Sequence, residues 1–316
     1  ETGFNAVFPV VWNKALTLFP SQTMLKTFGR EIDPAHKGRD PLEEVIIEGH
    51  RVGLKVIPWF EYGFASSYQQ NGGHILAQKP QWAAKDSKGN LLVKNGFYWM
   101  NSLDSEVQDF LLKIILEVVR NYDIDGIQGD DRFPALPSEG GYDEKTLKRY
   151  YQEFNCYPHI CDRNPEWLKW RGDILTAFLT RLYQEIKAIK PQILISISPG
   201  IFNWCYREYL QDYPTWMEKG IVDLIHPQLY RRDFPSYKTL VDRLVKLHSN
   251  SGKLSIVFPG ILIKVGNYRI KEEDLLKAIF YNRKKNINGE ILFFYEGLRE
   301  NNNALAKALR KSAYGS

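Results

Sequence analysis

The sequence predicts an α/β protein of the TIM-like (β/α)8 barrel class, and three observations lead to that class. Seven runs rich in β-branched and aromatic residues alternate with helical patterns along the 316 residues. Strands that alternate with helices pair in parallel through right-handed crossovers. Polar and aromatic residues gather at the carboxyl ends of these runs, where a barrel assembles its site. Gly-rich phosphate loops are absent from the sequence, which argues against a doubly wound nucleotide-binding sheet.

The predicted strands are the seven apolar runs. In chain order they cover residues 4–12, 54–62, 124–131, 193–199, 222–230, 254–261 and 290–296. A closed barrel needs eight strands, and the chain enters its first run almost at once. We therefore expect that a first strand and helix precede residue 1 in the parent sequence. On that expectation, residues 124–131 form the fourth strand.

Helical patterns separate the runs, and the clearest covers residues 104–122. It has Asp104 at the N-cap, Glu106 in the first turn and apolar residues spaced three and four apart. The other helical patterns cover residues 41–52, 167–190, 237–248, 272–285 and 304–312. Long connections at about 64–100 and 132–165 are rich in aromatic residues and are predicted to wall a groove. Neither resembles an independent domain, so we expect one domain over residues 1–316.

The composition of the chain restricts the classes of partner and ligand that we expect it to bind. The 42 basic and 37 acidic residues are interspersed, so no stripe for nucleic acid stands out despite the net charge of +5. No run approaches the length of a membrane-spanning helix, and no signal segment is recognised. Cys156 and Cys161 flank His159, but a fourth ligand at zinc-site spacing is missing from the sequence. The sequence thus predicts no metal site and no cofactor, and it leaves the oligomeric state open.

The stretch at 121–134 (NYDIDGIQGDDRFP) is the one most suggestive of chemistry. A strand there ends in Asp130 and Asp131, followed by Arg132, before Pro134 prevents further ladder pairing. Adjacent carboxylates on an extended backbone point to opposite sides, so one can face the barrel axis while the other pairs with Arg132 or a loop amide. An acidic turn, or a salt bridge to Arg132, is the alternative interpretation.

Together with five further segments, this stretch resembles the glycoside-hydrolase-like family 10 proteins, especially the cyanobacterial type. The segments are 4–13, 38–65, 99–131, 170–200, 222–230 and 293–298. The resemblance implies a TIM-like barrel acting on glycans in the cell envelope or outside the cell. A class of enterobacterial relatives is associated with cutting peptidoglycan strands stripped of their peptides.

The family's fourth-strand pattern falls on residues 125–127 (DGI) and on the pair Asp130 and Asp131. Two positions depart from it. Gly129 stands where an aromatic residue is usual, and Arg132 stands where an aromatic residue or His often follows. The family's opening strand, which resembles RGVWLT, is missing from this sequence, in keeping with the expected preceding strand.

Glycosidic cleavage needs a proton donor and a second carboxylate, about 5 to 5.5 Å apart for retention and about 6.5 to 9.5 Å for inversion. Asp130 resembles the nucleophile position of α-amylase-like barrels and is assigned the ionised role. Asp131 then holds a substrate hydroxyl or serves as the second carboxylate. Glu61 and Glu296 are the candidate donors, because neighbouring rings would raise a carboxyl pKa by desolvation. Either could instead be a rim carboxylate bound to a backbone amide.

Substrate-binding candidates are polar and aromatic residues near the ends of the runs. They are Trp12, Asn13, Trp59, Tyr62, Arg132, His226, Gln228, Tyr230 and Tyr295. His226, Gln228 and Tyr230 alternate along one strand, so all three can face the same way. For His226 and for each Trp considered singly, core packing is the alternative.

The sequence therefore favours a glycoside hydrolase whose partner is a polysaccharide or oligosaccharide. A catalytically silent carbohydrate-binding barrel is the alternative, although a binder needs rings and amides rather than converging carboxylates. A metal-dependent deacetylase is disfavoured because the sequence lacks a clear His/His/Asp cluster.

Overall fold

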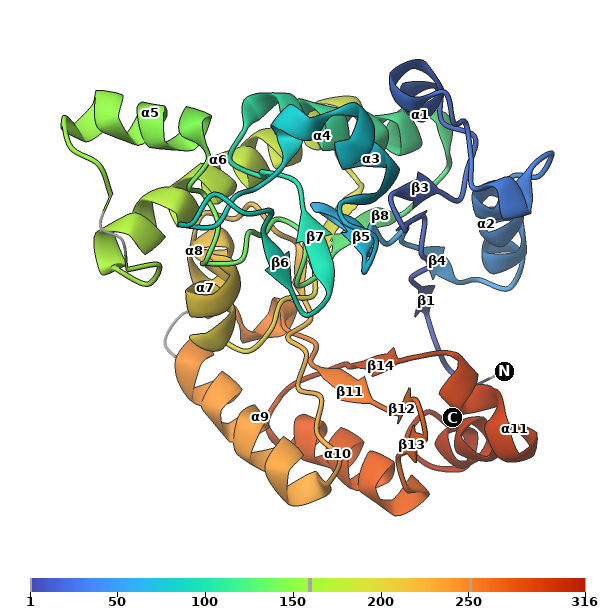
Figure 1. Cartoon of the computed structure of the whole chain (residues 1–316). Helices are drawn as coiled ribbons and strands as arrows, with labels where there is room; N and C mark the ends of the chain where they lie inside the picture. Colours follow the sequence, from blue (N-terminus) through green and yellow to red (C-terminus); the bar gives the residue numbers. More distant parts are fainter. Residues whose placement is uncertain (1, 159–160, 250–251, 316) are drawn as a thin grey trace.

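A computed structural model describes residues 2–158, 161–249 and 252–315. It shows a mixed α/β fold in which a strand lies in each of the seven predicted runs (Figure 1). These strands are β1 (Ala6–Val7), β4 (Lys55–Val56), β8 (Gly126–Gly129), β9 (Leu194–Ile197), β10 (Leu224–Ile225), β11 (Gly260–Leu262) and β14 (Ile291–Phe293). Part of one prediction is wrong. Residues 254–256 form a 3-10 helix, η3 (Leu254–Ile256), instead of the start of a strand.

The seven strands lie side by side in chain order. Parallel ladders join β1 to β4, β8 to β9, β9 to β10 and β11 to β14. Single parallel bridges, Trp59 to Gln128 and Gln228 to Gly260, connect the remaining neighbours, β4 with β8 and β10 with β11. Within the described ranges, no ladder joins β14 to β1.

Prolines explain why the strands are shorter than the apolar runs. A proline has no backbone N–H to give to a ladder, but its carbonyl still accepts. At five places the next strand donates to such a carbonyl, at 2.7 to 3.1 Å. The acceptors are Pro9, Pro58, Pro199, Pro227 and Pro259, and the donors are Trp59, Gln128, Gln228, Gly260 and Ile291. Strand neighbours therefore stay in register beyond the ends of the regular ladders.

Helices lie around the outer side of the strands (Figure 1). Their bounds are α1 (Gln22–Phe28), η1 (Pro34–His36), α2 (Pro41–Arg51), α4 (Ser105–Asn121), α6 (Pro165–Ile189), α7 (Trp204–Tyr209), α8 (Tyr213–Glu218), α9 (Phe234–His248), α10 (Glu272–Lys284) and α11 (Glu296–Lys311). Asp104 caps α4 as predicted, accepting from the Glu106 amide at 3.0 Å. α9 begins three residues before its predicted start, because Asp233 caps it through the Ser236 amide at 2.8 Å.

The two long connections fold onto the same body. Residues 64–100 form a small antiparallel sheet, β5 (Ala65–Tyr68), β7 (Phe97–Trp99) and β6 (Val93–Lys94), with α3 (Gly73–Gln78) and η2 (Pro80–Trp82). Residues 132–165 contain α5 (Glu144–Phe154), whose Tyr150 ring packs edge-on against Trp167 of α6 at 5.2 Å. Two hairpins complete the fold, β2 (Trp12–Asn13) with β3 (Leu16–Thr17) and β12 (Lys264–Val265) with β13 (Tyr268–Arg269).

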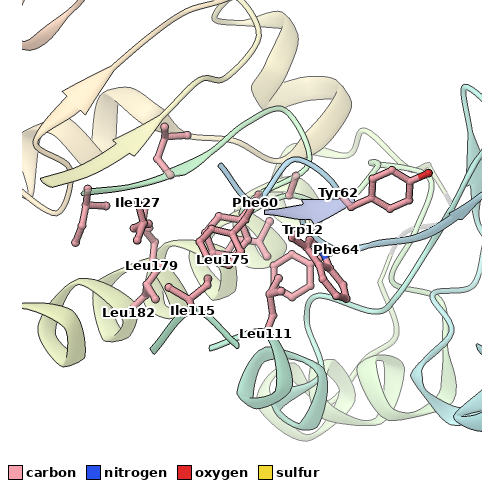
Figure 2. Close-up of a cluster of buried hydrophobic side chains, with 14 of the residues drawn as sticks. Trp12, Phe60, Tyr62, Phe64, Leu111, Ile115, Ile127, Leu175, Leu179 and Leu182 are labelled. Atoms are coloured by element: carbon pink, nitrogen blue, oxygen red, sulfur yellow. The ribbon is translucent and has the colours of Figure 1, made fainter. Parts of the chain in front are cut away.

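The core fills the space between the strands and the helices α4 and α6. Figure 2 shows Ile127 of β8 facing Ile115 of α4 and Leu179 of α6, and all three are fully buried. These apolar positions recur three and four residues apart on each helix, so one face of each is removed from water. The long α4 pattern in the sequence is thus explained by its packing.

Arg171 of α6 binds the long connection at residues 132–165 to this core. The side chain is fully buried, and its guanidinium donates to the carbonyls of Ser138 at 2.6 Å, Gly140 at 2.5 Å and Asp162 at 2.6 Å. It also lies 4.4 Å from the centre of the Trp167 ring. Burial lowers the pKa of Arg171 to about 10, so the group stays charged at neutral pH. One side chain therefore satisfies three loop carbonyls that have been removed from water.

We expect Arg171→Met to lower the free energy of unfolding by about 3 kcal/mol, because several buried carbonyls lose their donor. Lys169→Met is the matched control, since Lys169 lies on the same helix with its side chain 70% exposed. Urea unfolding of both variants tests this. Equal losses in the two variants would contradict the role given to Arg171.

Candidate active site

The carboxyl ends of β4 and β8 meet at the candidate site. The amide of Gln128 donates to the Pro58 carbonyl at 2.8 Å, and the amide of Phe60 donates to the Gln128 carbonyl at 2.8 Å. This pairing places Glu61, which follows β4, next to the acids that follow β8. It also brings Glu61 within hydrogen-bonding distance of Arg132, although the two residues lie 71 positions apart in the chain.

Arg132 joins the acids in one cluster. Its Nη2 lies 3.0 Å from Oε1 of Glu61 and 2.9 Å from Oδ2 of Asp130, and its Nη1 lies 3.6 Å from Oδ1 of Asp131. Its Nε donates to the Glu61 carbonyl at 2.8 Å, and the guanidinium lies over the Phe97 ring at 4.8 Å. We call Glu61, Asp130, Asp131 and Arg132 the acid cluster.

The three carboxylates differ in depth. The Asp130 side chain is 1% exposed, whereas those of Glu61 and Asp131 are 21% and 27% exposed. Asp130 accepts from the Arg132 amide at 2.8 Å and lies beneath the guanidinium. Gln211 holds the same residue from the other side, donating to its carbonyl at 2.7 Å. Glu61 and Asp131 therefore present the carboxylates that solvent can reach.

Burial shifts the pKa of two of the three acids. It raises the pKa of Asp130 well above the ordinary value, and it raises the pKa of Glu61 as well. The charge of Arg132 opposes both shifts, but one guanidinium cannot neutralise three carboxylates. The upward direction at Glu61 agrees with the predicted proton donor. At Asp130 it runs against the ionised role expected from the sequence.

A side-chain hydrogen bond from Asn13 and a glycine at position 63 hold Glu61 and Arg132 close together. Asn13, at the end of β2, donates its side-chain amide to Oε2 of Glu61. Gly63 has a φ of 48°, and a Cβ at this position would collide with the Arg132 carbonyl. The amide of Phe64 donates to that carbonyl at 3.0 Å. A glycine at position 63 thus allows the two loops to touch.

Three of the predicted aromatic residues pack against other rings or the backbone. Trp12 is fully buried, with Nε1 donating to the Gly63 carbonyl at 3.0 Å (Figure 2). Tyr62, also buried, lies edge-on to Phe97 at 5.6 Å. Trp59 lies edge-on to Phe293 at 6.2 Å. A fully buried ring such as Trp12 presents no face on which a sugar could stack, so its position matches the core-packing alternative.

The three alternating candidates, His226, Gln228 and Tyr230, follow β10 in the chain. Tyr230 stacks on Phe293 at 5.2 Å, and burial raises its pKa, with a further contribution from the charges of Asp131 and Asp130. Gln228 donates to the Ser198 carbonyl at 2.9 Å. The buried His226 contacts the Phe258 carbonyl through Nδ1 at 3.0 Å.

Glu296 and Tyr295 lie in a different setting from the acid cluster. Glu296 is paired with Nζ of Lys264 at 2.6 Å and its side chain is 63% exposed. Tyr295 is 66% exposed, and its hydroxyl accepts from Nη1 of Arg299 at 3.4 Å. Of the four predicted catalytic acids, the structure thus gathers Glu61, Asp130 and Asp131 around Arg132, while Glu296 pairs with Lys264.

Sequence reasoning missed three residues near the acids. Phe97 supports the guanidinium, Gln211 fixes the Asp130 backbone, and Tyr209 has its pKa raised by burial and by Asp131. Beside Tyr209, at 5.4 Å, lies the ring of Trp204, which is 50% exposed. The aromatic content of 64–100 was a signal for Phe97, whereas the sequence around Gln211 carries none.

Within the described ranges, no group of three or more His, Cys, Asp or Glu residues is placed to hold a metal ion. Cys156 and Cys161 are exposed to solvent, and His159 lies outside the described residues. Among the helices that the structure describes, none is both long and apolar enough to cross a membrane.

The fold and the family comparison define a protein of the glycoside-hydrolase-like class. The chain belongs to the family "Glycosyl hydrolase-like 10", whose model matches residues 1–280. It is 27% identical over 254 residues to the glycosyl hydrolase DigH of Escherichia coli K12, covering 72% of this chain and 55% of that protein. It is 28% identical over 259 residues to the glycosyl hydrolase YngK of Bacillus subtilis, covering 73% and 46%. The chain spans about half the length of these curated relatives.

Solved structures show the same fold. The glycoside hydrolase domain of PgaB (BpsB) from Bordetella bronchiseptica has a TM-score of 0.67 at 14% identity, covering 86% of this chain and 79% of that chain. Alpha-L-fucosidase isoenzyme 2 from Paenibacillus thiaminolyticus also has a TM-score of 0.67, at 20% identity, covering 98% and 43%. At these identities the likeness is one of architecture.

Acid pH should test the environment of His226. Because a carbonyl only accepts, Nδ1 carries the proton and Nε2 is a bare, buried acceptor that has no hydrogen-bond partner in the part of the chain that the structure describes. Burial lowers the pKa of His226 to about 4. Between an unfolded pKa of about 6.5 and the folded value, only the unfolded chain takes up this proton, so stability falls as pH falls.

We expect this residue to remove about 3 kcal/mol of stability between pH 6.5 and 4. His226→Gln should flatten the pH dependence of the free energy of unfolding across that window. The comparison with the parent chain cancels the contribution of the buried acids, whose raised pKa values act in the opposite direction. Parallel pH profiles for the two proteins would contradict the burial argument.

Arg132→Met should destabilise the fold by about 3 kcal/mol at neutral pH, because the deeply buried Asp130 loses its cation. Adding Asp130→Asn should restore part of the loss, since the uncompensated charge is then gone. The deficit of the single variant should shrink as pH falls and Asp130 takes up a proton. A double-mutant cycle by urea unfolding tests the pair, and additive losses would show that the two side chains act independently.

Proposed function

We propose that this chain is a glycoside hydrolase that cleaves a polysaccharide at the acid cluster. The observation that supports it is the contact of Glu61, Asp130 and Asp131 with the single side chain of Arg132 at the carboxyl ends of β4 and β8. Sites of barrel enzymes are built at this face. Glycosidic cleavage requires two carboxyl groups in different protonation states, and the differing burial of these acids provides the difference.

Glu61 is the proton donor in this proposal. Desolvation raises its pKa, which suits a group that must hold a proton at neutral pH, and its side chain is 21% exposed. Asn13 and Arg132 orient the carboxyl from both sides. The donor can therefore reach a glycosidic oxygen without a large rotation.

Asp131 is the second, substrate-facing carboxylate. It is the most exposed acid of the cluster, and its distance of 3.6 Å from Arg132 leaves it the least restrained. Asp130 has the deeper position under the guanidinium and acts as a positioning residue that fixes Arg132. This assignment moves the substrate-contacting role from Asp130, favoured by the sequence, to its neighbour.

The polymer to test first is peptidoglycan glycan stripped of its peptides, the substrate implied by the family resemblance. An extended sugar chain needs flat apolar surfaces beside the acids, because sugar rings stack on aromatic faces. We assign that task to the exposed ring of Trp204. It lies beside the ring of Tyr209, whose pKa is raised by burial and by the charge of Asp131.

The alternative is a carbohydrate-binding barrel without catalysis, and one observation favours it. Arg132 covers Asp130 and contacts all three acids, as in a structural ion network. Binding of glycan oligosaccharides without any shortened products would support this alternative against the hydrolase.

We expect Glu61→Gln and Asp131→Asn each to reduce turnover at least about a hundredfold, because each removes a group that acts on the reacting bond. Asp173→Asn, a change to an exposed carboxylate on α6, is the control and should leave turnover unchanged. Product release from a panel of polysaccharides, followed by mass analysis, provides the measurement.

Asp130→Asn should act differently. As a positioning residue it should change the pH profile of kcat/KM, because Arg132, whose charge lowers the pKa of Glu61, loses a contact that fixes it. Near-normal turnover in Asp131→Asn together with abolished turnover at every pH in Asp130→Asn would reverse the two roles and overturn this assignment.

A further inference from the structure

A second concave site lies in the helix layer, against α9. It is a cavity of about 400 Å³ between α9, the segment 201–203 that follows β9, and Tyr213 at the start of α8. Its walls are apolar, with Leu229 from the end of β10 and Leu240 and Leu244 from α9. Cavities of this size hold small organic ligands. None of the acid-cluster residues lines it, so this inference does not rest on the proposed hydrolysis.

Two cations stand at the rim of the cavity. Arg243 and Lys246 are residues of α9 that line its opening. Neither forms an ion pair with any residue that the structure describes. By contrast, Lys238 of the same helix is paired with Asp242 at 3.1 Å. The cavity therefore combines an apolar interior with a positive rim that the described part of the protein does not neutralise.

We propose that this cavity binds an amphipathic anion, namely a free medium-chain fatty acid. The acyl chain would lie against Leu240 and Leu244, where its burial removes apolar surface from water. The carboxylate would lie at the rim, where Arg243 and Lys246 can each give it a charge-assisted hydrogen bond. Long basic side chains suit this arrangement because their stems cover apolar surface while their charged heads stay in water.

The shape of the site favours a single chain over a membrane surface. The lining combines buried side chains, Tyr213 and Leu244, with Leu247, which is 41% exposed at the mouth. Because the lining extends from an exposed side chain to buried ones, one flexible chain can lie along it. Vesicles that bind as well as the free acid would point to a lipid headgroup and overturn the choice of ligand.

Calorimetric titration of the full chain with decanoate tests the proposal, with decanol and decyltrimethylammonium as matched probes. We expect decanoate to bind at least about tenfold more tightly than decanol, because the alcohol lacks the charge that the rim recognises. The cationic amphiphile should bind more weakly than decanol. Vesicles of phosphatidylglycerol should bind no better than vesicles of phosphatidylcholine.

The double variant Arg243→Gln/Lys246→Gln should weaken decanoate binding at least about tenfold while leaving decanol binding unchanged. Lys238→Gln removes one charge from the same helix away from the rim and should have no effect. Leu247→Trp, which narrows the mouth, should weaken both decanoate and decanol. Thermal unfolding checks that each variant is folded.

Three further outcomes would overturn the proposal. They are the absence of decanoate binding by the parent chain, equal affinities for decanoate and decanol, and unchanged decanoate binding in the Arg243→Gln/Lys246→Gln variant. Loss of hydrolysis in the Glu61 variant would leave all of these measurements unaffected, so failure here is distinguishable from failure of the proposed function.

Discussion

The hydrogen bond from the Gln128 amide to the Pro58 carbonyl is the interaction on which the site depends. It supports the single bridge between the β4 and β8 runs, Trp59 to Gln128, and so brings Glu61 close to the acids that follow β8. The same device recurs between other strand neighbours, with Pro9, Pro199, Pro227 and Pro259 as acceptors. A proline near the carboxyl end of a strand frees the following residues from ladder pairing while it keeps the register. Those following residues form the face where polar side chains gather.

An unequal charge balance governs the acid cluster. Three carboxylates share one guanidinium, and burial adds a cost to every charge that remains. The outcome is a raised pKa at Asp130 and Glu61, the two acids that contact Nη2. Phe97 covers the other face of the arginine, which limits the water that could screen the cluster. A fixed cation beside two acids of raised pKa suits acid–base chemistry better than simple neutralisation would.

The segment 226–229, which follows β10, contributes residues to two different parts of the molecule. His226 and Gln228 contact the carbonyls of Phe258 and Ser198, which belong to the neighbouring runs, while Pro227 and Leu229 line the cavity beside α9. Alternate residues of this short segment thus have different surroundings. Substitutions at alternate positions of this short segment should therefore affect either the contacts with the neighbouring runs or the cavity beside α9.

Local patterns in the sequence were enough to predict the seven strands, most helix positions, the family, and the acids at the end of β8, because these follow from periodicity, caps and short motifs. How those acids are used depends on the folded chain. Strand pairing brought Glu61 to Arg132 and gave Gln211 its contact with Asp130, whereas Glu296 paired with Lys264. Trp12 is buried in the core, and Asp130 is buried next to Arg132. No local sequence pattern determines how deeply these side chains are buried. Contacts between residues as distant in sequence as Glu61 and Arg132 depend on register and packing, which exist only once the chain has folded.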